Sequence, residues 1–185
     1  MKLVVASDIH GSGYYCKMLM DAFDAERADR LLLLGDILYH GPRNDLPQEY
    51  GPKMVIRLLN ERKDVIMCVR GNCDAEVDQM VLDFPIMAEY CMVEEDGLTM
   101  FATHGHHYNE SHLPPLGHID VLFNGHTHVP KCVSHGNYYY MNPGSVSLPK
   151  EGSHHGYIVY ENRTFTWKDL ERNVVHTCSI GTENT

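Results

Sequence analysis

Five short polar clusters, each following a stretch of apolar residues, constrain the fold of this chain more than any other feature. Their side chains supply two carboxylates, one amide and four imidazoles, which is the donor set of a two-metal hydrolytic centre. A single Asp or His at a strand end is ordinary, but five clusters in this order indicate a metal site. The clusters are Asp8-Ile9-His10, Gly35-Asp36, Gly71-Asn72-Cys73-Asp74, Thr103-His104-Gly105-His106 and Gly125-His126-Thr127-His128.

The first half of the chain alternates between two kinds of apolar pattern. Short continuous runs at residues 3–6, 31–34 and 65–69 are typical of strands buried on both faces. Apolar residues at helical spacing predict helices over residues 15–23 and 55–59. This alternation favours a parallel sheet with crossover helices.

The second half, after Pro85, is rich in short strand patterns separated by turns. We therefore expect an α/β protein of one domain, residues 1–185, with two mixed β-sheets sandwiched between helices in a four-layer α-β-β-α arrangement. The expected strands are residues 88–93, 98–103, 121–124, 138–141, 157–160 and 164–167, with one more within residues 172–180.

The clusters are far apart in the sequence but are expected to meet. Open α/β sheets bind ligands beyond the carboxyl ends of their strands, so loops after different strands converge there. Asp8 and His10 are two residues apart, and on extended backbone both side chains would leave the same face. His126 and His128 repeat that spacing.

Two other residues of this set are informative for different reasons. Asp36 follows a Leu-rich strand, where a charge is costly unless it is paired or metal-bound. Asn72 offers a neutral amide oxygen to a hard metal, although an ordinary turn residue after Gly71 is the alternative.

Composition narrows the class of partner and the compartment. The net charge of −10 argues against binding of long nucleic acid, which requires a basic face. Six cysteines without Cys-x-x-Cys spacing favour free thiols in a reducing cytoplasm. An early charge at the N-terminus and the lack of an apolar run of about 18 residues favour a soluble cytoplasmic protein without a membrane span.

The order Asp-x-His, Gly-Asp, Gly-Asn-x-Asp, x-His-Gly-His and Gly-His-x-His resembles the calcineurin-like metallophosphoesterase superfamily over residues 8–128. Residues 35–44, 70–74 and 142–147 resemble more narrowly the small bacterial YfcE-type phosphodiesterases. The resemblance implies two divalent metal ions, Mn²⁺ first with Fe, Zn or Mg as alternatives, and in-line attack on a phosphodiester by a bridging hydroxide. It implies Asp8, His10, Asp36 and His128 as ligands of one ion, and Asp36, Asn72, His104 and His126 as ligands of the other.

The chain departs from the wider superfamily at two substrate-facing places. Cys73 follows the ligand Asn72 where many members have a histidine that protonates the leaving oxygen, and a neutral thiol is a poor acid for this purpose. Tyr39 and His40 stand where Asp and Arg are frequent. We therefore expect a preference for phosphodiesters with good leaving groups, or the use of another acid, for which His40, His106 and His107 are candidates.

Weaker predictions concern neighbouring residues. Arg43 and Asn44 are candidates for phosphate contact, with a solvated loop as the alternative, and Asp74 is expected to orient its loop or a ligand histidine. A small phosphodiester is the expected substrate; a phosphomonoesterase of the same fold, or a protein-binding scaffold resembling the retromer subunit, are the alternatives. The physiological substrate and the oligomeric state, including a homo-oligomer, stay open.

Overall fold

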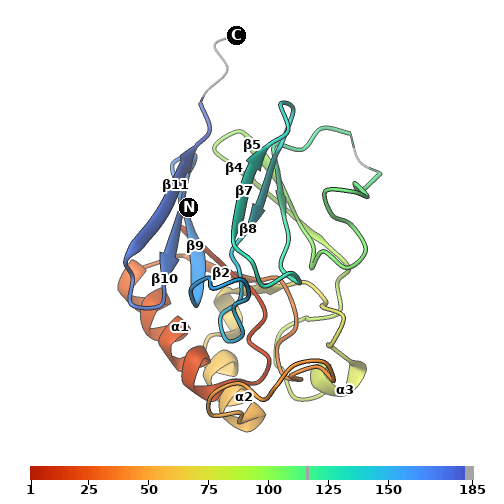
Figure 1. The fold of residues 1–185 in the computed structure, drawn as a ribbon, viewed down its shortest axis with the longest axis vertical. Coiled ribbons are helices and arrows are strands. Elements are labelled where there is room, and N and C mark those ends of the chain that lie inside the picture. The colour runs from red at the N-terminus through yellow and green to blue at the C-terminus, as the bar shows by residue number, and fades with distance from the viewer. Residues whose placement is uncertain (116, 182–185) are drawn as a thin grey trace.

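A six-stranded mixed sheet forms one half of the computed structural model, which describes residues 1–115 and 117–181 (Figure 1). Its strand order is β11-β10-β9-β1-β2-β3. The parallel strands β1, β2 and β3 are continuous with antiparallel β9, β10 and β11. The bounds are Leu3–Ala6 for β1, Arg30–Leu33 for β2, Ile66–Cys68 for β3, Gly156–Glu161 for β9, Thr164–Asp169 for β10 and Val174–Ser179 for β11.

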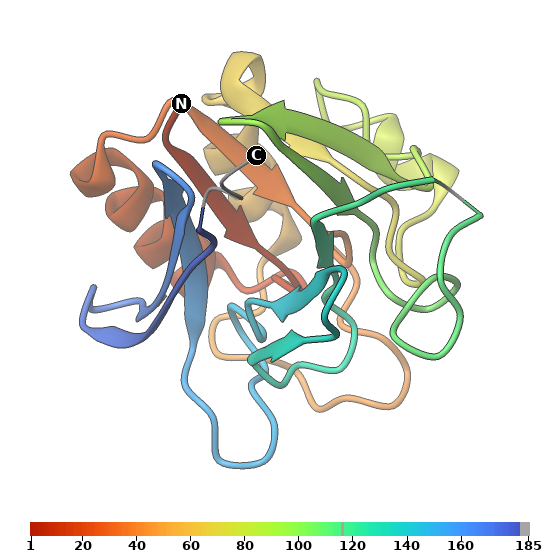
Figure 2. The same ribbon diagram turned by 90° about the horizontal axis from the view of Figure 1, so that it is seen from above.

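A five-stranded mixed sheet of order β4-β5-β6-β8-β7 packs against the first one (Figure 2). Strands β5, β6 and β8 are parallel, and the two edge strands are antiparallel to their neighbours. The bounds are Cys91–Glu95 for β4, Leu98–Ala102 for β5, Val121–Phe123 for β6, Lys131–Ser134 for β7 and Tyr139–Asn142 for β8. The two mixed sheets of the predicted fold class are confirmed.

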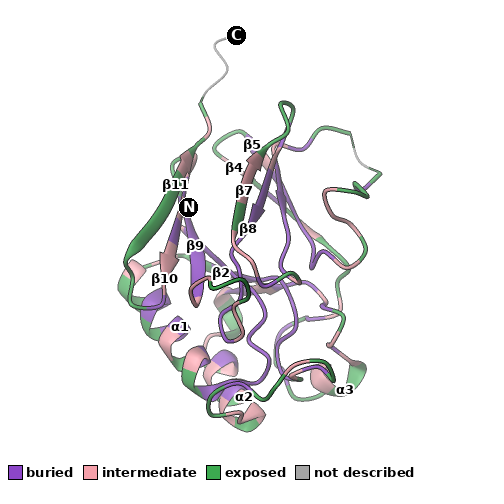
Figure 3. Ribbon diagram, viewed as in Figure 1, coloured by how far each residue is buried: buried purple, intermediate pink, exposed green. Residues whose placement is uncertain are grey.

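Helices α1 (Gly13–Glu26) and α2 (Pro52–Asn60) cover the outer face of the six-stranded sheet. Ser12 begins α1 by accepting a hydrogen bond from the backbone N–H of Tyr15 through its hydroxyl, a typical N-cap. A second apolar cluster lies between the sheets and includes the fully buried Trp167. The burial colours of Figure 3 follow this layering, with buried inner strands and an exposed edge strand β11.

Some elements differ from the sequence predictions. The short helix α3 (Glu76–Gln79) and the edge strand β7 were not expected, because each is short and mixes polar with apolar residues. The outer face of the five-stranded sheet carries a third apolar cluster, against which the loop residue Tyr108 packs. Among the described residues, no helix is long and apolar enough to cross a membrane.

Candidate metal centre

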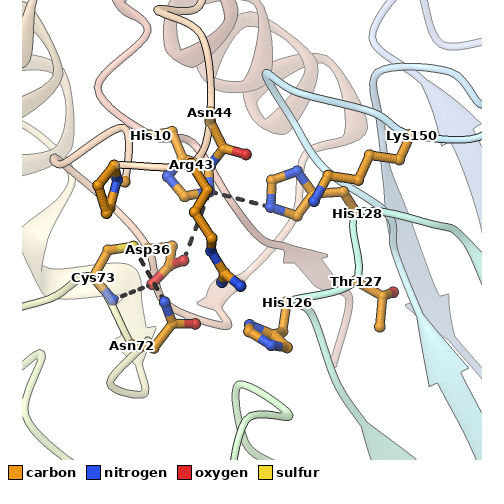
Figure 4. A pocket seen from close by; sticks show the side chains of 12 residues that line it. His10, Asp36, Arg43, Asn44, Asn72, Cys73, His126, Thr127, His128 and Lys150 are labelled. Carbon is orange, nitrogen blue, oxygen red and sulfur yellow. Dashed lines mark hydrogen bonds and ion pairs between the residues drawn. The ribbon is translucent and has the colours of Figure 1, made fainter.

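All five polar clusters meet in the loops that follow β1, β2, β3, β5 and β6. At one side of the cluster, Nε2 of His128 lies 3.2 Å from Oδ1 of Asp8. His10 lies between the two carboxylates, with its Nε2 3.5 Å from Oδ1 of Asp8 and 3.6 Å from Oδ2 of Asp36. His104 approaches Asp36 from the other side, at 3.4 Å between Nε2 and Oδ2. Asp36 therefore lies between two groups of donors, and Figure 4 shows it between His10 of the first group and Asn72 of the second.

The second group of donors is completed by Asn72 and His126. Oδ1 of Asn72 lies 3.0 Å from Nε2 of His104, and Nδ1 of His126 lies 3.2 Å from the same nitrogen. The structure thus brings together all seven side chains that the sequence analysis named as metal ligands.

Three of the imidazoles are fixed in the same way. In the neutral form of each ring, we assign the proton to Nδ1, which donates to a backbone carbonyl and leaves the lone pair of Nε2 directed at the centre. These bonds join His10 to the carbonyl of Tyr39 (2.8 Å), His104 to that of Leu34 (2.6 Å) and His128 to that of Leu148 (2.6 Å).

The backbone at most of these residues is left-handed rather than extended. The φ angles are 59° at Asp8, 48° at His10, 56° at Asp36, 63° at His126 and 62° at His128. The expectation that Asp8 and His10 share a face because the segment is extended was therefore wrong, and so was its repetition for His126 and His128. Tight left-handed turns, held by tertiary hydrogen bonds, bring these side chains together instead.

Glycines allow the loops to approach one another closely. A Cβ at Gly71 would lie 2.1 Å from Oδ1 of Asp36, and one at Gly125 would lie 1.9 Å from Oγ of Ser7. Neither distance is compatible with a side chain. The glycines next to Asn72 and His126 are thus required by the packing of the centre.

Asp74 holds the two loops that carry Asp36 and Asn72. Its Oδ2 accepts hydrogen bonds from the backbone N–H groups of Gly71 (2.7 Å) and Asp36 (2.8 Å), and its Oδ1 accepts one from Ile37 (2.9 Å). This arrangement confirms the loop-orienting role predicted for Asp74. Among the described residues, it makes no hydrogen bond to a ligand histidine.

The loop after β8 is hydrogen-bonded to the backbone of Asp8. The hydroxyls of Ser145 (2.8 Å) and Ser147 (3.1 Å) both donate to the backbone carbonyl of Asp8. Asn142 donates through Nδ2 to the carbonyl of Gly125 (2.8 Å). Residues 142–147 were named only as part of the family resemblance, and nothing in their local sequence pattern predicts these long-range bonds.

Buried charge makes the centre suited to cations. Burial raises the pKa of Asp8, but the facing imidazoles of His10 and His128 outweigh it and hold that pKa well below its usual value. Burial lowers the pKa of His104, whereas Asp36 and Asp8 raise it to about 9. Oδ1 of Asp8 is buried and accepts no hydrogen bond from any described residue. Oxygen and imidazole donors around an unsatisfied carboxylate oxygen fit divalent metal ions.

Comparison with known proteins agrees with this geometry. A model of the calcineurin-like phosphoesterase superfamily domain matches residues 1–164 of the chain. The chain belongs to the calcineurin-like phosphoesterase superfamily. Phosphodiesterase YfcE of Escherichia coli K12 is a 46% identical relative over 162 residues, which are 88% of each chain.

Solved structures resemble the chain at different levels. A structure of E. coli YfcE, described as a phosphoesterase, aligns with a TM-score of 0.94 and 42% identity, covering 98% of this chain and 100% of that one. A Vps29 variant from Entamoeba histolytica aligns with a TM-score of 0.64 over 98% of this chain and 100% of that one. Its 16% identity shows a shared fold alone.

A pocket of about 400 Å³ opens over the centre. Some of the residues that line it were predicted from the sequence, and one was not. Arg43 and Asn44 line it, as does Cys73, whose pKa is raised to about 12 by burial and by Asp36, so that it is a neutral thiol. Lys150 also lines it, and Figure 4 shows Arg43 and Lys150 reaching into it from two different loops. Lys150 was missed because it belongs to no motif.

His40 occupies a different place. It is not among the described residues that line the pocket, and its ring packs edge-on against Tyr39 (4.8 Å between centroids) and Tyr50 (5.3 Å). Its backbone carbonyl accepts a hydrogen bond from Nδ2 of Asn44 (2.8 Å). His40 therefore contacts the pocket wall through Asn44.

Proposed function

We propose that this chain is a metal-dependent phosphodiesterase that acts on small phosphodiesters. The observation that carries the proposal is the convergence of seven oxygen and nitrogen donors beneath an open pocket of about 400 Å³. Membership of the phosphoesterase superfamily and the 46% identity to an E. coli phosphodiesterase support the same reaction. The size of the pocket favours a small substrate over a long nucleic acid.

Two divalent ions are assigned to these seven residues. Asp8, His10 and His128 would hold one ion, Asn72, His104 and His126 would hold the other, and Asp36 would contact both. Mn²⁺ is our first choice because the family resemblance implies it, and a donor set without thiolate also suits the alternatives Fe, Zn or Mg. When bound, such ions supply a water of lowered pKa and positive charge opposite the phosphate oxygens.

The remaining groups of the pocket act on the substrate. Arg43 and Lys150 place two positive charges where the non-bridging phosphate oxygens would lie, and the amide of Asn44 adds a hydrogen-bond donor. Cys73 is a neutral thiol with a pKa of about 12 and lies next to Asn72. In our assignment the leaving group of the substrate lies on this side of the pocket. A weak acid in this position favours substrates whose leaving group departs without protonation.

Hydrolysis of an aryl phosphodiester and of the matching aryl phosphomonoester, measured side by side, tests the proposal. The protein is stripped of metal with a chelator and assayed with no metal, Mn²⁺, Mg²⁺ or Zn²⁺. We expect metal-dependent turnover of the diester and much slower turnover of the monoester. Equal turnover of both would favour the phosphomonoesterase alternative, and no turnover with any metal would contradict an enzymatic function.

We further propose that the enzyme works in the cytoplasm. All six cysteines are present as free thiols, four of them only partly buried, and such thiols persist in a reducing compartment. Cell fractionation with an antibody against the chain tests this location.

A further inference from the structure

A second group of metal-binding side chains lies beside the main centre and is formed by Glu89, His106 and His107. One ligand atom from each of these residues lies within 4.8 Å of the others. The rings of His106 and His107 have centroids 4.0 Å apart and are inclined at 43°. None of the three is among the described residues that line the pocket over the main centre.

The fold holds these residues together. Strands β4 and β5 are antiparallel, and Cys91 pairs with Ala102, so the segment that enters β4 lies beside the segment that leaves β5. The hydroxyl of Thr103 donates to the backbone carbonyl of Glu89 (3.0 Å), which holds the backbone of Glu89 beside the loop that carries the two histidines.

His106 carries a polar atom that the rest of the chain leaves unused. Its Nδ1 is buried and makes no hydrogen bond with any described residue. Its ring lies 5.4 Å from that of His104 and 6.3 Å from that of His126, between centroids. The group therefore adjoins the main centre without sharing a ligand with it.

We propose that Glu89, His106 and His107 form an accessory site for a divalent transition-metal ion, with Zn²⁺ as the preferred occupant. Two imidazoles and one carboxylate are a ligand set that zinc accepts, and hard ions such as Mg²⁺ prefer oxygen ligands throughout. Ligand atoms around one tetrahedral zinc ion are about 3.4 Å apart, given bonds of about 2.0–2.1 Å. Glu89 and His107 are exposed, so small rotations of their side chains reach that spacing.

Three protein ligands at a partly exposed position leave room for water, so the ion would exchange with solvent. This site is independent of the reaction proposed above, because it uses none of the seven residues assigned there.

The test is the zinc content of the full chain at a fixed free zinc concentration. Metal-stripped wild type, Glu89→Gln and His107→Gln are dialysed against buffered zinc, and zinc per chain is measured by atomic emission. We expect each variant to hold one ion fewer than the wild type. Both side chains are exposed, so an unchanged thermal melting curve without metal shows that the variants fold.

His135→Gln provides the matched control. Nε2 of His135 lies 2.9 Å from Oε1 of Glu110, which makes another surface His–carboxylate pair, but without a second histidine. We expect this variant to bind as much zinc as the wild type. Equal zinc contents in all four proteins would overturn the proposed site, and so would an equal loss of zinc in the control. Both outcomes are independent of how much zinc the main centre binds, because only differences between the proteins are compared.

Discussion

Replacing Asp74 with asparagine tests whether one buried carboxylate holds the two loops of the metal centre. Asp74 is 2% exposed and accepts three backbone N–H bonds, two at Oδ2 and one at Oδ1. Asparagine retains one oxygen for the donors Gly71 and Asp36, but presents an NH₂ group to the N–H of Ile37. The variant therefore loses one bond and places two donors face to face.

The expected cost follows from the bonds affected. Losing a hydrogen bond to a charged acceptor costs about 1.5–3 kcal/mol, and the two bonds that remain become neutral and weaker. We expect Asp74→Asn to lower the free energy of unfolding by about 3 kcal/mol. That is a large part of the 5–15 kcal/mol typical of a folded domain.

Urea unfolding followed by circular dichroism at pH 8 measures this change, with chelator present so that bound metal adds nothing. Asp83→Asn is the control, because Asp83 is exposed and its ion pair with Lys63 spans 3.6 Å, so we expect a change below about 0.5 kcal/mol. If Asp74→Asn also unfolds within 0.5 kcal/mol of the wild type, the three bonds do not hold the loops as described.

Other predictions concern substrate and pH. We expect Cys73→His to speed hydrolysis of diesters with poor leaving groups at least ~10-fold relative to aryl diesters, since it supplies an acid; an unchanged profile would contradict this. Lys150→Gln should raise KM about fivefold, as loss of an exposed ion pair of about 1 kcal/mol implies, whereas Lys53→Gln on α2 should not. Burial raises the pKa of Glu26, but Lys168 (2.6 Å) and other partners outweigh it and lower that pKa. The pair therefore stabilises the fold above the ordinary pKa of Glu26, and this contribution is lost as the pH falls through the lowered value. Glu26→Gln should cost at most about 1 kcal/mol in urea unfolding at pH 7 and nothing in acid; an equal cost at both would contradict this.

The sequence predicted the fold and the convergence of the candidate metal ligands because both depend on strands. Apolar runs such as residues 31–34 define buried strands, and a polar residue directly after such a run marks the strand end. Parallel strands place their carboxyl ends together, which brings Asp36 and Asn72 close despite 35 intervening residues. Strand β7 was missed because its residues are only half buried and its apolar pattern is short.

Residues that act through long-range contacts could not be predicted in the same way. Lys150 lines the pocket because its turn folds back over His128, to whose carbonyl its backbone N–H donates (3.1 Å). His40 shares a loop with Arg43, yet only Arg43 lines the pocket, since the Tyr50 ring packs against His40. Neither outcome follows from local spacing, because each depends on which segment packs against the loop.

The left-handed backbone at five of the seven proposed ligands explains how these loops direct their side chains. Each such residue carries a local strain of roughly 1–3 kcal/mol, which surrounding bonds must offset. Those bonds are present: His10 N–H donates to the carbonyl of Asp36 (2.9 Å), and His126 N–H donates to Oδ2 of Asp8 (3.0 Å). Aspartate and histidine are also among the non-glycine residues that most often adopt this conformation. The residue types that bind metal are therefore the ones that tight turns at strand ends tolerate. Strands determine where the ligands converge, and the left-handed turns determine the direction in which each one points.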